Sequence, residues 1–179
     1  INGVPVCTAN REQDEPVLVS DAAGGAVIVW NDFRNIDSDI YAQRVDMNGT
    51  SLWGADGVTL CSAANHQRFP QIVGAGGSGV VVTWDDYRSG NSDVYARKID
   101  MNGNPLWTAN GVAVTTAANT QDLHRITGDG SGGVIVVWDD KRNGNNGESG
   151  IYAQRVDTNG NAVWTADGIA VYASANIEW

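Results

Sequence analysis

The residues best suited to chemistry in this chain form the motif Trp-x-Asp-x-Arg, which occurs three times. An indole face beside a carboxylate and a guanidinium suits a sugar, because the sugar ring can stack on the indole while the charged groups bond its hydroxyls. Three such sites would bind weakly one by one and gain by multivalency. The same residues could instead form an Arg–Asp pair that fixes one turn in every repeat. Both interpretations stay open, and the candidate ligand-binding residues are Trp30, Asp32, Arg34, Trp84, Asp86, Arg88, Trp138, Asp140 and Arg142.

A second repeated motif, Asp-x-Asn-Gly, resembles the start of a calcium-binding loop. Such a loop needs a bidentate Glu at its twelfth position, but Gly stands there in all three copies. Asn-Gly pairs favour a tight hairpin, because both residues accept positive φ. We therefore predict turns, no metal site and no cofactor, with calcium held by other loop oxygens as the alternative. The motifs begin at Asp46, Asp100 and Asp157, and the twelfth positions are Gly57, Gly111 and Gly168.

A catalytic group should occur once, at a place where the repeats differ from one another. The differing positions hold His124, Lys141 and Glu148, with no Ser or Cys beside them in the sequence. The only other histidine is His66, and two histidines without a Cys cluster do not make a zinc site. From the sequence we predict no catalytic residues and expect that the chain is not an enzyme.

These motifs recur because the chain is built from copies of one unit. Trp30, Trp84 and Trp138 are 54 residues apart, and a longer loop at 143–149 extends the third copy. We predict one domain with repeat 1 at about 3–56, repeat 2 at about 57–110, repeat 3 at about 111–167 and the start of a fourth at 168–179. A Gly-Val segment that closes each unit also opens the chain at residues 3–6. The expected content is three units plus one extra strand.

The sequence of each unit predicts about four short strands and no helix. Residues 80–84 and 134–138 are apolar and β-branched up to their Trp, bounded by Gly and Asp, as in strands buried on both faces. Small sheets with two apolar faces must pack on their neighbours. We predict an all-β, propeller-type repeat of four-stranded antiparallel blades. A threefold β-trefoil or a β-prism-like fold is the alternative.

Composition restricts the partners. The chain has 21 acidic against 11 Lys and Arg residues and a formal net charge of -10, which argues against a nucleic-acid partner. No apolar run approaches the roughly 18 residues of a membrane helix. Cys7 and Cys61, the only cysteines, occupy equivalent places in neighbouring units and are expected to be unpaired thiols.

The order of the motifs within each repeat resembles a known type of repeat. The order Trp-x-Asp-x-Arg, then Asp-Ile/Val-Tyr-Ala, then Asp-x-Asn-Gly resembles repeats of large secreted or surface-attached bacterial proteins, which are taken to be β-propeller blades. The resemblance implies an extracellular or cell-surface setting and further blades, but no agreed catalytic residues. The third unit departs from it with His124 and Lys141.

These observations lead to a ranked expectation of function. We expect a non-catalytic extracellular module for binding or adhesion, which recognises glycans or protein surfaces multivalently. One alternative is a purely structural repeat or assembly unit of a larger surface protein or filament. A weaker one is part of a glycan-processing enzyme. Because the sequence ends within a repeat, self-association or additional blades are expected to complete a ring.

Overall fold

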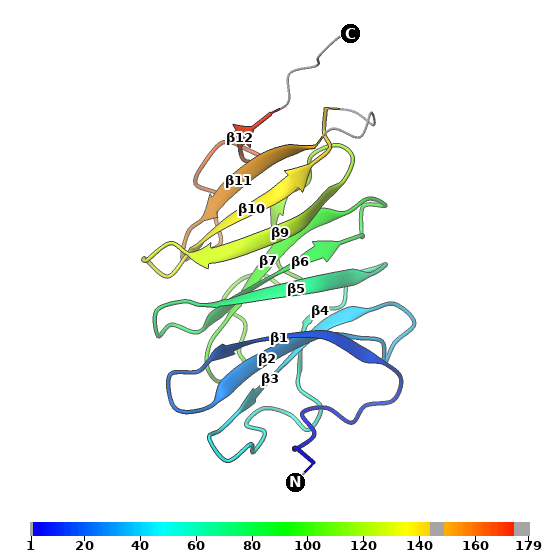
Figure 1. Ribbon diagram of the computed structural model, residues 1–179, viewed down its shortest axis with the longest axis vertical. Helices are drawn as coiled ribbons and strands as arrows, with labels where there is room; N and C mark the ends of the chain where they lie inside the picture. Colours follow the sequence, from blue (N-terminus) through cyan, green and yellow to red (C-terminus); the bar gives the residue numbers. More distant parts are fainter. Residues whose placement is uncertain (1, 144–148, 174–179) are drawn as a thin grey trace.

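The computed structural model describes residues 2–143 and 149–173, and these form twelve β-strands without a helix. The strands make three four-stranded antiparallel sheets (Figure 1), so the all-β prediction with four strands per sheet is confirmed. Each sheet takes its strands in chain order. The first contains β1 (Gln13–Ser20), β2 (Ala26–Asp32), β3 (Asp39–Val45) and β4 (Val58–Cys61); the second β5 (Gln67–Gly74), β6 (Val80–Asp86), β7 (Asp93–Ile99) and β8 (Val112–Thr115); the third β9 (Gln121–Gly128), β10 (Val134–Asp140), β11 (Gly150–Val156) and β12 (Ile169–Tyr172).

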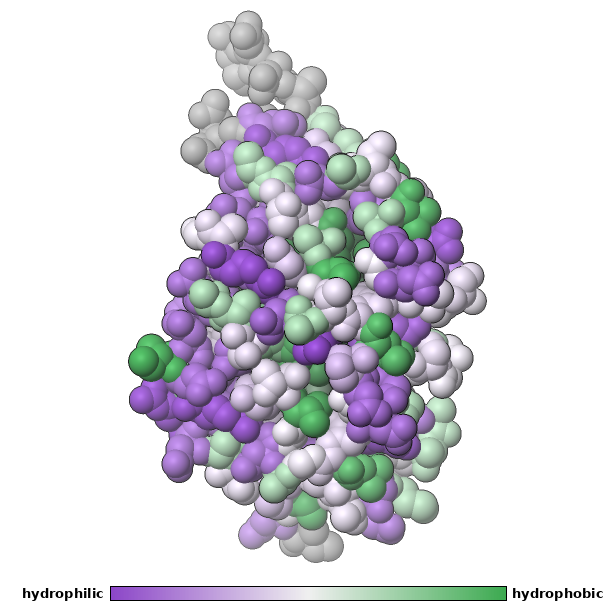
Figure 2. Space-filling view, turned by 180° about the vertical axis from the view of Figure 1, so that it is seen from behind, coloured by the Kyte–Doolittle hydropathy of each residue, from purple (hydrophilic) through white to green (hydrophobic). Residues whose placement is uncertain are grey.

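The sequence pattern explains the layering. The second strands are apolar runs, and β6 is buried at every position because the second sheet lies between the other two. The sheets stack along the long axis of the molecule, with β1, β5 and β9 next to one another (Figure 1). Two apolar clusters fill the two spaces between sheets. On the back of the molecule, hydrophobic side chains stand in separate groups among hydrophilic ones (Figure 2).

The second Trp of the first and second repeats joins one sheet to the next. Trp53 Nε1 donates to the Met101 carbonyl at 3.2 Å, and Trp107 Nε1 donates to the Thr158 carbonyl at 3.0 Å. Both acceptors lie in Asp-x-Asn-Gly turns of the following sheet. The turn needs glycine there, since a Cβ on Gly103 would lie 3.1 Å from the Trp53 ring and its φ is +84°.

The extra strand expected at residues 3–6 does not form. Its counterparts in later units are β4, β8 and β12, and each pairs with the strand that precedes it in the chain, which is the third strand of the same sheet. Residues 3–6 have no such preceding strand among the described residues, so their backbone has no ladder to join. The sheets are therefore offset by one strand from the sequence units, and residues 169–172 complete the third sheet.

Turn carboxylates and buried carboxyls should give opposite pH effects on stability. Backbone N–H groups hold the pKa of Asp21, Asp46 and Asp157 below its usual value, so their stabilisation is lost as the pH falls below about 4. Burial instead raises the pKa of Asp39 and Asp93. Ionisation of Asp39 and Asp93 therefore lowers the free energy of unfolding as the pH rises above about 4.

We expect the free energy of unfolding to rise from strongly acidic pH to a maximum at about pH 4 to 5 and then to decline gently towards neutrality. Urea unfolding followed by Trp fluorescence across this range measures the profile. A curve that climbs without a maximum up to neutral pH would contradict the assignment of the buried carboxyls.

Candidate functional site

The three Trp-x-Asp-x-Arg motifs form the same compact group in each sheet. In the second sheet, Arg88 Nε and Nη2 donate to the two carboxylate oxygens of Asp86 at 2.7 and 2.6 Å, and Trp84 Nε1 donates to the same carboxylate at 2.8 Å. Arg88 Nη2 also reaches the Asn110 carbonyl at 2.8 Å, and its guanidinium lies 3.9 Å from the centre of the Tyr95 ring. The group ties the end of the second strand to the loop before the fourth.

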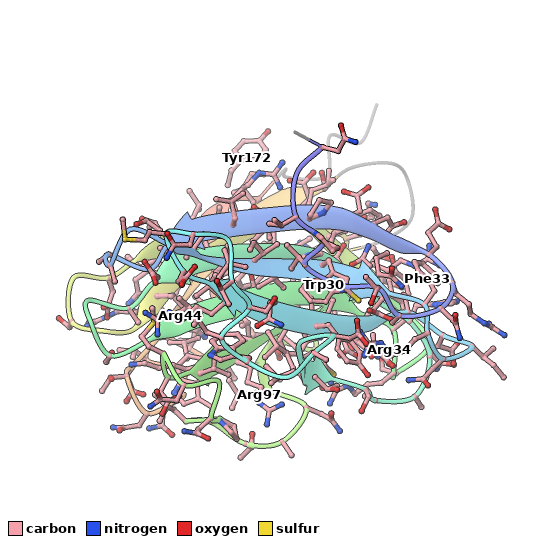
Figure 3. All side chains as sticks on the ribbon, turned by 90° about the horizontal axis from the view of Figure 1, so that it is seen from below. Trp30, Phe33, Arg34, Arg44, Arg97 and Tyr172 are labelled. Carbon is pink, nitrogen blue, oxygen red and sulfur yellow. The ribbon has the colours of Figure 1, made fainter. Side chains whose placement is uncertain are left out.

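Burial leaves these tryptophans no face for a sugar. Trp30, Trp84 and Trp138 are 3%, 0% and 1% exposed, and Trp30 lies among the strands of the first sheet (Figure 3). A Cβ on Gly111 would come within 2.6 Å of the Trp84 ring, so that edge of the indole is closed as well. This geometry favours the structural interpretation of the nine candidate residues, and a ligand-binding role for them stays a prediction without support from the arrangement.

A different set of side chains surrounds a cavity of about 290 Å³ where the first strands of the three sheets meet. Its walls come from β1, β5 and β9, with contributions from β6 and the residue that follows it. Aromatic and apolar side chains such as Phe69, Pro70 and Leu123 form part of the lining. The polar lining residues are Glu15, Gln71, Asp85, Tyr87, Asp122, His124 and Arg125.

A β-bulge in each first strand shapes this cavity. The register with the second strand shifts between Asp14 and Val17 in the first sheet, and at the equivalent places in the other two. The bulge residues Glu15, Phe69 and Leu123 have φ of 50°, 56° and 53°, which non-glycine residues seldom adopt. All three line the cavity, as expected if the bulges re-aim side chains towards a functional centre.

The most distinctive contact is a buried pair between the second and third sheets. His124 Nδ1 lies 2.7 Å from Asp85 Oδ1, and both side chains are almost fully buried. Burial raises the pKa of Asp85, and the hydrogen bond with His124 offsets part of that rise. Among the described residues, His124 Nε2 has no hydrogen-bond partner although it is buried. A buried imidazole with one nitrogen oriented and the other free is equipped to exchange a proton.

Further charged groups flank the pair. Lys141 Nζ lies 3.1 Å from Asp122 Oδ2, while Asp122 Oδ1 is buried without a partner in the described part of the chain. Glu15, from β1, is exposed and also lines the cavity. The cavity thus brings together carboxyl groups from three strands with the His124 imidazole, and the Lys141 ammonium lies beside one of those carboxyl groups.

The sequence contained a signal for this cavity. His124 stands where Pro16 and Pro70 stand in the other units, and Lys141 replaces an aromatic residue, so two of the three repeat-breaking positions meet here. Glu148, the third, lies outside the described residues. The four residues after the repeated Gln also vary between copies, reading DEPV, RFPQ and DLHR. Glu15, which has Phe69 and Leu123 at its equivalent positions, could have been identified from this variation.

Three further observations concern the cysteines, metal sites and membrane-spanning helices. Cys7 and Cys61 are both free thiols, as predicted. The described residues contain no cluster of three or more His, Cys, Asp or Glu side chains arranged to hold a metal ion. Over the same residues, the chain forms no helix with the length and apolar character needed to cross a membrane.

Comparison with known proteins identifies similar folds. No protein-family model matches the chain, and no curated protein matches it significantly. A solved structure described under the GH130 family of mannoside phosphorylases, with glycoside hydrolases that target β-1,2 mannosidic linkages in Candida mannan, matches 92% of this chain and 52% of its own at TM-score 0.55 and 10% identity. A glycosyl hydrolase from Bacteroides ovatus matches 92% and 52% at TM-score 0.52 and 9% identity. A protein of Bacteroides ovatus ATCC 8483, provisionally described as a glycoside hydrolase, matches 86% and 49% at TM-score 0.53 and 13% identity.

These similarities correct the expected function. The chain spans about half the length of each of these structures, and identities this low show a shared fold. The expectations of a non-catalytic adhesion module and of a chain that is not an enzyme are contradicted, because the similar folds are those of glycoside hydrolases and phosphorylases. Repetition of the polar motifs had pointed to structure or multivalent binding, whereas His124, the partner of Asp85, lies where the repetition fails.

Proposed function

We propose that this chain is part of a glycan-processing enzyme that cleaves glycosidic bonds at the cavity between its first strands. The observation that carries the proposal is the buried Asp85–His124 pair, with a free imidazole nitrogen, in a cavity that also holds Glu15. The similar folds of glycoside hydrolases support it.

The proposed architecture is a propeller in which each sheet is one blade. The first strands would surround the central axis, because β1, β5 and β9 are neighbours and wall one cavity. Ligands of such folds bind where strands from several blades converge, since each blade contributes different side chains to one site. The similar structures are about twice as long, which supports further blades in the complete ring.

The cavity supplies the two roles that glycoside cleavage requires. One carboxyl group protonates the leaving oxygen, and a second acts as base or nucleophile on the other side of the sugar. The Asp85–His124 pair, with the raised pKa of Asp85, would deliver its proton to the glycosidic oxygen as the C–O bond breaks. Glu15 would accept the proton of the attacking water.

Aromatic side chains in the same cavity support a sugar substrate. Phe69 and Tyr87 line it, and Phe69 is half exposed at its bulge, so its ring offers a face on which a sugar can stack. Lys141 adds a positive charge beside Asp122, which lines the cavity. An extracellular location, expected from the repeat text, stays a prediction that fits an enzyme acting on polymeric glycans.

The test is turnover of a panel of aryl glycosides and of β-1,2-linked mannooligosaccharides, each with and without inorganic phosphate. We expect cleavage of one sugar type and a loss of about 10²-fold or more in Glu15→Gln, because the second carboxylate is removed. Glu12→Gln is the matched control, since Glu12 is exposed one residue before β1.

Two results together would overturn the proposal. The first is that no member of the panel is cleaved or phosphorolysed. The second is that none of these sugars raises the melting temperature of the protein, because a ligand that binds only the folded state must stabilise it.

A further inference from the structure

The outer face of the third sheet repeats an interface that the other two sheets have already formed. Leu60, Val114 and Val171 occupy the same place in the three repeats, and they are 1%, 2% and 63% exposed. The first two lie in the apolar clusters between consecutive sheets. Val171 lies at the equivalent position of β12, and among the described residues no further sheet covers it. Ile169 and Val137 on this face are also exposed.

The same face of the third sheet also carries polar side chains whose equivalents in the first sheet bond to the following sheet. In the first sheet Arg44 Nη1 donates to the Met101 carbonyl at 2.9 Å, beside the bond from Trp53. The equivalent residues of the third sheet are Arg155 and Trp164. Arg155 bonds Asp129 within its own sheet, and among the described residues neither side chain reaches a following sheet.

The first sheet carries the complementary face. Leu18 is 67% exposed, whereas its equivalents Ile72 and Ile126 pack against the clusters between sheets. Met47 occupies the same place in its turn as Met101, whose carbonyl accepts both bonds, and is itself exposed. The two open faces lie at opposite ends of the molecule, near β12 and near β3 (Figure 1).

We propose that the open face of the third sheet binds the first sheet of a second copy of this chain, head to tail. The contact would continue the two interfaces within the molecule, with Val171 packed near Leu18 and with Arg155 and Trp164 donating to the Met47 carbonyl. An interface between different faces of identical copies is heterologous, and it either closes or extends into an array. The inference does not depend on the enzymatic proposal.

The N-terminal segment, residues 2–8, modulates this contact. Thr8 N donates to Asp56 Oδ1 at 2.8 Å, as Ser62 N donates to Asn110 Oδ1 at 3.1 Å in the next repeat. The segment thus occupies the place of a preceding sheet's last strand. It covers part of the first sheet and must move, or pair with the second copy, when that copy binds.

Sedimentation velocity of the 179-residue chain from micromolar to near-millimolar concentration tests the proposal. We expect reversible association that Val171→Asp and Leu18→Asp each weaken by about tenfold or more, because a charge is buried in an apolar contact. Ile36→Asp is the matched control, since Ile36 is exposed in the loop between β2 and β3, away from both faces.

Mixing the two variants gives the sharper test. Val171→Asp retains an intact first sheet and Leu18→Asp retains an intact third sheet, so an equimolar mixture should form a 1:1 dimer that neither variant forms alone. A chain that stays monomeric at every concentration would overturn the proposal. Association without complementation in the mixture would also overturn it, because a contact between two like faces would not need Leu18.

Discussion

Asp86→Ala is expected to lower the free energy of unfolding by about 3 to 5 kcal/mol, the cost of removing one partner of a buried ion pair. The Asp86 side chain is fully buried. Its carboxylate accepts hydrogen bonds from the Trp84 indole and from the Arg88 backbone and guanidinium. The substitution would leave a half-buried positive charge and a buried indole N–H without an acceptor.

Urea unfolding followed by circular dichroism measures this loss. Glu12→Ala is the control, because Glu12 is exposed, and its effect should stay within about 0.5 kcal/mol. If Asp86→Ala were as stable as the control, the motif could not be the tie that holds each sheet, and its ligand-binding interpretation would regain weight.

The second large effect concerns turnover of whichever glycoside the chain cleaves. Asp85→Asn should reduce it by about 10²- to 10⁴-fold, because the amide cannot supply the proton that the Asp85–His124 pair delivers. In the unsubstituted protein the rate should fall as the pH rises through the raised pKa of Asp85, since the acid must be protonated to act. The variant should lack this limb of the pH profile.

Asp139→Asn provides the matched control for this experiment. Asp139 occupies the same place in the third sheet as Asp85 in the second, but it does not line the cavity. Its replacement should leave turnover within about twofold. Equal losses in the two variants, or an unchanged pH profile in Asp85→Asn, would show that the pair is not the proton donor.

The fold was largely readable from the sequence because its signals are local. Residues 80–84 are mostly β-branched and apolar, a pattern that favours a strand buried on both faces, and Gly103 marks a turn that needs positive φ. The exception was residues 3–6. Their sequence resembles that of β4. A β-strand also needs a neighbouring strand to pair with, and the sequence of residues 3–6 does not show whether such a neighbour is present.

The candidate site was harder to read because its members come from three strands far apart in the chain. His124 was recognisable as a break in the repeat, but its partner Asp85 lies 39 residues earlier in another sheet. Repetition drew attention to Trp84 and Arg88, whose side chains bond the Asp86 carboxylate within one sheet. A motif present in every repeat reports what every sheet needs, whereas a single site requires differences between them.

The bulges at Glu15, Phe69 and Leu123 have a practical consequence for engineering. Three side chains as unlike as these occupy one backbone conformation in one molecule, so the strained position accepts varied chemistry without a change of fold. The tetrapeptides 14–17, 68–71 and 122–125 are therefore natural units for transplantation between the sheets. Exchanging them would redesign the cavity while the buried ties that support each sheet stay untouched.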